Sequence, residues 1–99
     1  MRGVKEQPSV SAAVDAAELK WPRADEAWQA VQWALARDPD VGPAINSSGT
    51  LRGFVFDGAK SIGLPTVEVI YRVESDHILI EDVEFRDSNM LKLEEHDHK

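Results

Sequence analysis

The chain has 99 residues, which is the size of one domain built around a single hydrophobic core. It contains no cysteine, which excludes disulfides and thiolate metal sites. Its formal net charge of -7 argues against a nucleic-acid ligand, because proteins that bind phosphates usually present a basic surface.

The negative charge is concentrated in the last third of the chain. Residues 67–99 hold ten acidic and four basic residues, whereas residues 1–66 are nearly neutral. An acidic surface of this kind favours a basic protein partner. No apolar run approaches the roughly 18 residues of a membrane span, and the first eight residues lack the apolar core of a signal peptide. We therefore expect no membrane contact and a cytoplasmic location.

Residues 1–18 are interpreted as an N-terminal leader. Their small-residue run at 11–17 is either a short helix or disordered. The next three residues, Leu19-Lys20-Trp21, are typical of a short strand that leads into Pro22.

A helix is expected from Pro22 to Arg37, because proline suits the first helical turn. It must end near Asp38, since a residue before proline avoids the helical region. Trp33 points away from its apolar stripe, and this side chain either packs on the N-terminal segment or forms an exposed partner contact. At about 100° per residue, the stripe that faces the sheet comprises Ala24, Ala27, Trp28, Val31 and Leu35.

Residues 50–56 predict a strand with Phe54 and Phe56 in the core. The turn dipeptide Asp57-Gly58 ends this strand. Residues 59–65 are a candidate for a short return strand.

Residues 67–86 carry the strongest pattern in the chain. Two runs rich in valine and isoleucine flank a polar segment at 74–77, which predicts an antiparallel hairpin. A two-residue turn at 75–76 would mix two acids into one largely apolar face. A three-residue loop at 75–77 instead gathers a face in which seven of eight residues are apolar. Because a slip of one residue exchanges the two faces, we expect the cleaner segregation and therefore the three-residue loop.

This register gives the other face of the hairpin an apolar centre and a charged rim, which is typical of a protein-binding surface. Ile70, Ile78 and Ile80 form the centre, and Asp82 and Glu84 belong to the rim. The alternative is that a second helix or the tail covers this face.

A charged tail follows at residues 87–99. Its His96-Asp97-His98 sequence lacks the supporting groups that fix metal ligands, so we expect no metal site there.

The arrangement over residues 19–86 resembles the RelE/ParE superfamily of toxin–antitoxin toxins. Leu19-Lys20-Trp21-Pro22-Arg23-Ala24 is similar to the family's first strand and its step into a helix, and Leu51-Arg52-Gly53-Phe54 is similar to the start of its meander. Val67-Glu68-Val69-Ile70-Tyr71 lies where the family has an Arg-Val-Ile-Tyr pattern. Ile78-Leu79-Ile80 through Val83-Glu84-Phe85-Arg86 is similar to its final strand, which often ends in Val-x-His-Arg. The resemblance implies an α+β fold, with one main helix on a three- to four-stranded antiparallel sheet and flexible tails.

The resemblance also implies a toxin-like component of a type II toxin–antitoxin system, whose partner is a small cognate antitoxin. Ribonuclease members of the family use cations on the sheet to stabilise the scissile phosphate. The candidates for that role here are Arg86, Arg72 and Arg52. However, Glu68 replaces the arginine of the family pattern and Phe85 replaces its histidine. Together with the acidic charge, these replacements disfavour the ribosome or mRNA as a target.

We therefore expect a protein that acts through protein binding, with a non-enzymatic interaction module on the same scaffold as the alternative. If the protein is an enzyme, the resemblance implies a RelE-type mRNA endoribonuclease. No cofactor is expected, and the sequence indicates no oligomeric state. The expected partner-binding residues are Trp33, Ile70, Ile78, Ile80, Asp82 and Glu84.

Overall fold

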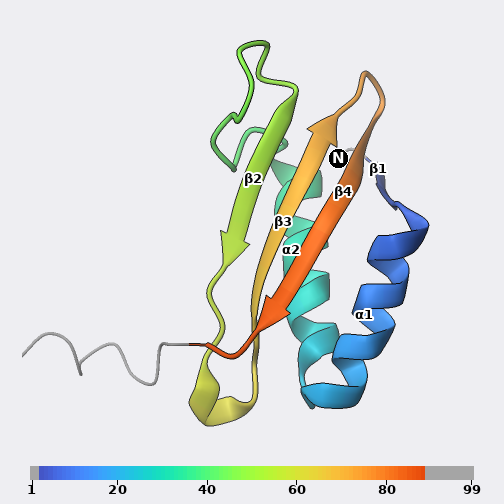
Figure 1. Cartoon of the computed structure of the whole chain (residues 1–99). Helices are drawn as coiled ribbons and strands as arrows, with labels where there is room; N and C mark the ends of the chain where they lie inside the picture. Colours follow the sequence, from blue (N-terminus) through green and yellow to red (C-terminus); the bar gives the residue numbers. More distant parts are fainter. Residues whose placement is uncertain (1–2, 89–99) are drawn as a thin grey trace, which may run out of the picture.

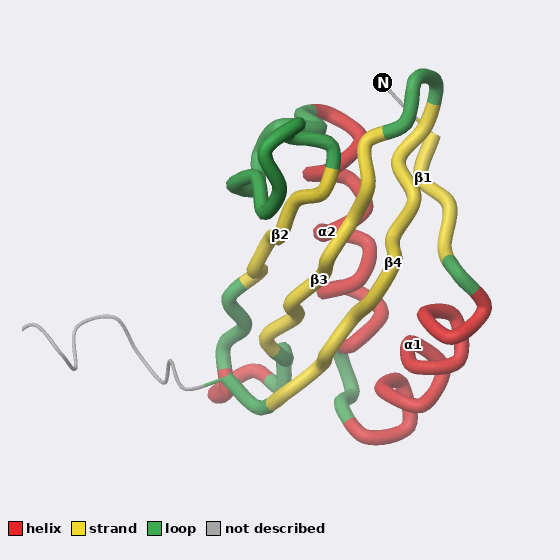
Figure 2. Tube along the Cα trace, turned by 45° about the horizontal axis from the view of Figure 1, so that its top comes forward, coloured by secondary structure: helices red, strands yellow, loops and turns green. Residues whose placement is uncertain are grey.

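The computed structural model describes residues 3–88, which form two helices and a four-stranded sheet (Figure 1). In chain order the elements are β1 (Gly3–Glu6), α1 (Pro8–Lys20), α2 (Ala24–Arg37), β2 (Leu51–Phe56), the short 3-10 helix η1 (Lys60–Ile62), β3 (Thr66–Val73) and β4 (His77–Arg86). The strand order is β1-β4-β3-β2. α2 lies against one face of the sheet, and α1 runs beside α2 and β4 (Figure 1, Figure 2). No described helix covers the opposite face, which we call the open face.

The expected α+β class is confirmed, but the sheet is mixed and not antiparallel. β1 pairs in parallel with β4, with Gly3 opposite His77 and Glu6 opposite Ile80. The other two strand pairs are antiparallel. The expectation of an antiparallel sheet is wrong because β1 is short and comes from a segment interpreted as a leader. Its partner strand is also distant from it in the sequence.

Residues 8–20 form α1, so the helical alternative for the small-residue run is the one the structure adopts. The strand expected at 19–21 is wrong, because Leu19 and Lys20 complete this helix and Trp21 is its C-terminal cap. Val10, Val14 and Ala17 recur at helical spacing and are buried in the core. Residues 3–20 are therefore part of the packed structure.

The helix expected after Pro22 is confirmed as α2. It ends at Arg37, immediately before Asp38 and Pro39, for the reason given above. The Trp28 ring packs on Phe85 of β4, with 5.9 Å between the ring centroids. Every member of the predicted stripe is buried, namely Ala24, Ala27, Trp28, Val31 and Leu35.

The strand expected at 50–56 is confirmed as β2, and Phe54 and Phe56 pack against the core. The short return strand expected within 59–65 is wrong. Residues 60–62 form η1, and a single bridge between Ala59 and Leu64 closes the turn.

The hairpin of β3 and β4 is confirmed, but its turn is the shorter of the two alternatives. Val73 pairs with Ile78, and the Glu74 N–H donates to the His77 carbonyl oxygen at 2.9 Å. A three-residue loop requires a left-handed third residue, and no described residue other than glycine has a positive φ.

A β-bulge then changes the register along the same hairpin. Tyr71 pairs with Ile80, but the next pair is Ile70 with Asp82, so Glu81 has no partner in the ladder. Beyond the bulge, β3 and β4 follow the register that the three-residue loop would have given. Combining the two registers places only apolar residues toward the helices, namely Val67, Val69, Tyr71, Val73, Ile78, Ile80, Val83 and Phe85.

This combination corrects the placement of two residues expected on the open face. Ile78 and Ile80 each have 0% of their surface exposed, and both belong to the hydrophobic core. The bulge comes after them along β4, so the two-residue turn still governs which way they point. Burying two large aliphatic side chains favours this solution over the one that would have exposed them.

Candidate functional site

The open face contains an apolar hollow of about 510 Å³ beside β2. Gly53 forms part of its floor because this residue has no side chain to fill the space. Ile45 and Val55 are 55% and 44% exposed, and both line the hollow together with Ile70. We use the name apolar hollow for the space lined by Pro43, Ala44, Ile45, Gly53, Phe54, Val55, Glu68, Val69 and Ile70.

Backbone hydrogen bonds hold the wall formed by residues 43–45 against β2. The Ile45 N–H donates to the Leu51 carbonyl oxygen at 2.7 Å, and the Gly53 N–H donates to the Pro43 carbonyl oxygen at 3.1 Å. These bonds occupy part of the outer edge of β2. The wall is therefore fixed in place, and the hollow is formed before any partner binds.

Tyr71 and Arg52 anchor the segment that leads into this wall. The buried Tyr71 hydroxyl donates to the Pro39 carbonyl oxygen at 2.7 Å and accepts the Gly42 N–H at 3.1 Å. Burial raises the pKa of this hydroxyl, so it stays protonated and can donate. The Arg52 guanidinium donates to the carbonyl oxygens of Gly42 and Gly49 at 2.7 and 3.0 Å.

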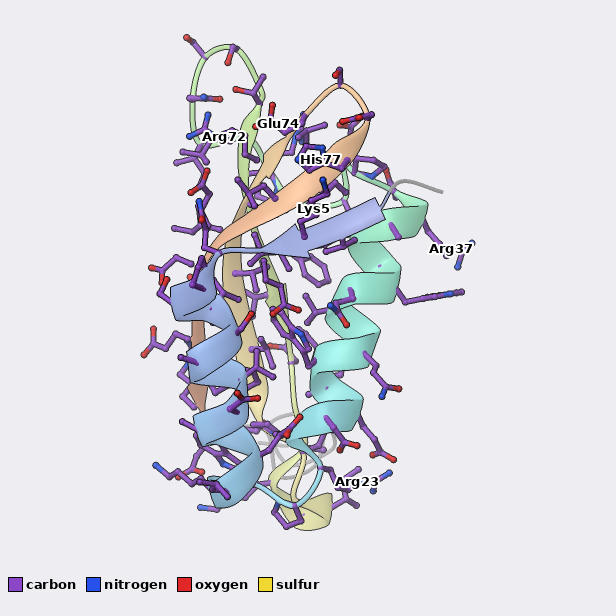
Figure 3. The ribbon with its side chains drawn as sticks, turned by 90° about the vertical axis from the view of Figure 1, so that its right-hand side faces the viewer. Lys5, Arg23, Arg37, Arg72, Glu74 and His77 are labelled. Carbon is purple, nitrogen blue, oxygen red and sulfur yellow. The ribbon has the colours of Figure 1, made fainter. Side chains whose placement is uncertain are left out.

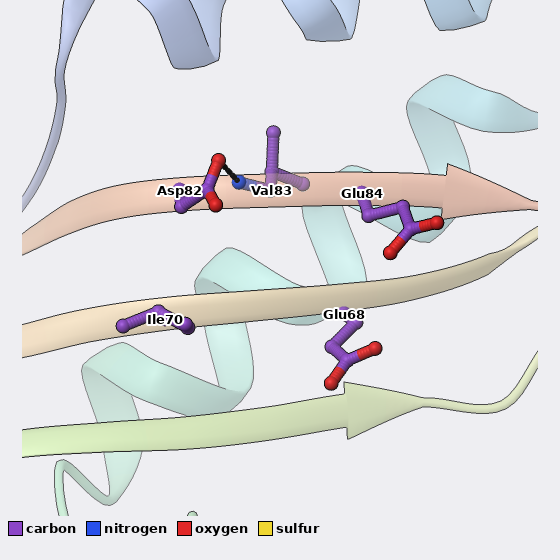
Figure 4. Close-up of a pocket in the computed structure, with 5 residues that line it drawn as sticks. All are labelled: Glu68, Ile70, Asp82, Val83 and Glu84. Atoms are coloured by element: carbon purple, nitrogen blue, oxygen red, sulfur yellow. Dashed lines mark hydrogen bonds between the residues drawn. The ribbon is translucent and has the colours of Figure 1, made fainter. Parts of the chain in front are cut away.

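A smaller pocket of about 140 Å³ lies between β3 and β4 (Figure 4). Three carboxylates surround it, and we call it the acidic notch, lined by Glu68, Ile70, Asp82, Val83 and Glu84. Glu68 stands directly opposite Glu84 in the strand ladder, and Asp82 stands opposite Ile70. Like charges in directly opposite positions of a sheet repel each other.

Arg86 offsets part of this repulsion. One guanidinium nitrogen lies 2.9 Å from a Glu68 oxygen and 3.9 Å from a Glu84 oxygen. Asp82 instead accepts the N–H of the adjacent Val83 at 2.9 Å. Within the part of the chain that the structure describes, Asp82 forms no ion pair.

A separate ion pair on the open face joins β3 to the bulge. The Arg72 guanidinium donates to Glu81 at 3.0 Å, and the Gln7 amide donates to the other Glu81 oxygen at 3.3 Å. The bond from Arg72 is the main cause that lowers the pKa of the Glu81 carboxyl, and the bond from Gln7 adds to it. Figure 3 shows Arg72 on the side of the molecule opposite to Arg37 of α2.

The structure does not bring the three candidate catalytic arginines together. Arg86 pairs with Thr66 at one end of β3 and Arg72 lies at the other end, so their backbones are roughly 20 Å apart. Arg52 stands opposite the buried Tyr71, on the helix-covered face. Each guanidinium already binds carboxylates or carbonyl oxygens of this chain, as described above. These arginines do not converge on a common phosphate position.

The expected partner-binding residues are also divided between different surfaces. Ile70, Asp82 and Glu84 lie together around the acidic notch. Trp33 is 56% exposed on α2, away from the sheet, and the Arg37 guanidinium stacks 4.4 Å from the centre of its ring. Trp33 is therefore exposed, but it does not share a surface with the open-face residues.

Sequence reasoning missed the apolar hollow. Its useful signal was Gly53 within a strand, since glycine there often marks a close approach or a missing side chain. Ile45 had no comparable signal, because only the bridge between residues 44 and 52 brings it over the sheet.

Neither described helix is long and apolar enough to cross a membrane. Residues 3–88 contain no cluster of acidic, histidine or cysteine side chains able to hold a metal ion, and the histidines of the tail lie outside the described residues. Comparisons with protein-family models, curated proteins and solved structures found no match for this chain.

Proposed function

We propose that this protein acts by binding another protein through the open face of its sheet. The observation that carries the proposal is the preformed apolar hollow, whose walls include the exposed Ile45 and Val55. An apolar centre next to charged groups is the usual composition of a protein-binding patch. The three candidate catalytic arginines already bind groups of this chain and lie apart from one another, which supports protein binding in preference to phosphate chemistry.

A narrower form of the proposal is a toxin-like component of a cytoplasmic toxin–antitoxin pair, based on the sequence resemblance to RelE/ParE toxins. It predicts growth arrest when the protein is expressed, and rescue by a small protein encoded beside it. An RNA-cleaving toxin would lose cleavage in Arg86→Ala. Absence of growth arrest, and recovery only of partners unrelated to an antitoxin, would favour a non-toxic interaction module.

The binding proposal is tested by filling the hollow without disturbing the fold. A Cβ at Gly53 would lie 3.6 Å from Ile45 Cδ1 and 3.8 Å from the Val69 oxygen, which are ordinary contact distances. Gly53→Val should therefore fold, and valine is favoured in strands. Leu19→Ser is the matched control, since Leu19 is 91% exposed on α1.

Each tagged variant is used to capture proteins from the cells that make this chain. We expect at least one partner to be retained by the wild type and by Leu19→Ser but lost with Gly53→Val. Equal recovery of every partner by all three proteins would contradict binding through the open face.

A further inference from the structure

The apolar hollow and the acidic notch are adjacent, because Glu68 and Ile70 line both. One side of this shared wall is apolar and the other carries carboxylates. A ligand that covers both must therefore place an apolar group and a cationic group close together.

The charges of the notch are only partly neutralised within this chain. Three carboxylates, from Glu68, Asp82 and Glu84, surround the pocket, and within the described residues the one guanidinium paired with any of them is that of Arg86. A cation entering from outside would meet Asp82, which has no ionic partner among residues 3–88. The same cation would reduce the repulsion between Glu68 and Glu84.

We propose that the partner presents a basic amphipathic segment to this face. An aliphatic or aromatic side chain of the segment occupies the apolar hollow, and a neighbouring lysine or arginine enters the acidic notch. This inference rests on the proposed function and specifies the chemistry of the partner. The net charge of -7 on the whole chain supports it, since opposite charge steers a basic partner toward the surface.

Arg86 has a particular place in this arrangement, because it occupies the position of a cation beside Glu68. The partner's cation must share the notch with this guanidinium or displace it. Removal of the Arg86 charge should therefore strengthen binding of a basic segment. A role for Arg86 in holding an RNA phosphate instead predicts weaker binding of RNA when this charge is removed.

The test is a selection from a random dodecapeptide library displayed on phage, with the full-length chain as the target. Enriched peptides are synthesised, and their affinities are measured by fluorescence anisotropy against the wild type and its variants. We expect lysine or arginine within a few residues of an aliphatic or aromatic residue. Gly53→Val should weaken binding by roughly tenfold or more, as expected when a central apolar contact is lost.

The charge of the notch is tested with Asp82→Asn combined with Glu84→Gln. This double variant should lose affinity by about tenfold, whereas Arg86→Gln should gain several-fold. Asp15→Asn combined with Glu18→Gln is the matched control, because it removes the same charge from the exposed side of α1. It should change affinity by less than about twofold, and circular dichroism checks that every variant is folded.

Two results would overturn the inference in distinguishable ways. Peptides that depend on Gly53 but lack basic residues, or that tolerate the notch variant, would refute the basic partner and leave binding through the open face intact. A selection without any peptide whose binding depends on Gly53 would contradict both the partner chemistry and the proposed function.

Discussion

Glu68 and Glu84 face each other across β3 and β4, and the guanidinium of Arg86 lies within ion-pair distance of both. Two like charges in this position are unfavourable for the folded state, and one cation compensates for them. The stability of this end of the hairpin therefore depends on the Arg86 guanidinium.

Replacement of that cation gives a first prediction. Arg86→Gln should lower the free energy of unfolding by about 0.5–1 kcal/mol at low salt, because the two glutamates lose their shared partner. The loss should shrink in 1 M NaCl, since these groups are accessible to solvent and screened by ions. Urea denaturation at both salt concentrations measures it. Lys60→Gln is the control for a lost surface cation, and an equal loss in that variant would argue against a specific role for Arg86.

The bulge gives a second prediction. Deletion of Glu81 would join Ile80 directly to Asp82, which makes the ladder regular and leaves every inward side chain in place. The variant should fold and should lose about 1 kcal/mol or less, the worth of an exposed ion pair.

Deletion of Leu79 is the matched control for this experiment. It also makes the ladder regular, but it turns Ile80 outward and brings Glu81 opposite Tyr71 in the core. We expect this control to lose about 3 kcal/mol or more, because it removes a buried aliphatic side chain and buries a carboxylate. Urea unfolding of the two deletion variants compares them, and similar stabilities would show that the bulge does not set the register.

A third prediction concerns the anchor of the hollow's wall. Tyr71→Phe removes the hydroxyl that bonds to Pro39 and Gly42, and it leaves two backbone groups without that partner. The free energy of unfolding should fall by about 1–3 kcal/mol. Hydrogen exchange should accelerate at the Gly42 amide and not at the Ala59 amide, which bonds to Leu64 elsewhere. Unchanged protection of Gly42 would contradict the anchoring role.

A fourth prediction follows from the lowered pKa of the Glu81 carboxyl, whose ordinary value is 4.5. The folded state holds this proton less tightly than the unfolded state, so the stabilisation is complete above the ordinary pKa. It is lost as the pH falls through the lower folded pKa.

The wild type should therefore lose more stability than Glu81→Gln when the pH is lowered from 7 to 3. Glu18→Gln, on the exposed side of α1, provides the comparison for a carboxylate removed elsewhere on the surface. Urea titrations at the two pH values measure the difference. Identical acid sensitivity of the wild type and Glu81→Gln would show that the Glu81 carboxyl does not contribute to the pH dependence of the free energy of unfolding.

The same hairpin illustrates how much of the fold its sequence predicts. The apolar alternation located both strands, but it offered two registers that exclude each other in a regular ladder. Each is correct on one side of Glu81, and only a bulge allows both in one hairpin. A single regular register therefore predicts the wrong face for Ile78 and Ile80.

The success of the helix prediction has an equally local cause. α2 repeats apolar residues at helical spacing among polar ones and ends two residues before Pro39, so its apolar stripe follows directly from the sequence. α1 consists largely of alanine and polar residues, which give little contrast between its faces. The apolar hollow depends on contacts between residues 43–45 and β2, and no periodicity within either segment reveals them.

The parallel pairing of β1 with β4 joins the beginning of the described chain to its end. Contacts between such distant residues form slowly, because a long loop must close before they provide any stabilisation. During synthesis, β1 has no partner strand until residues 77–80 have emerged, although the two helices are already complete by then. β1 is therefore among the last elements to take its place in the sheet, although it precedes both helices in the chain.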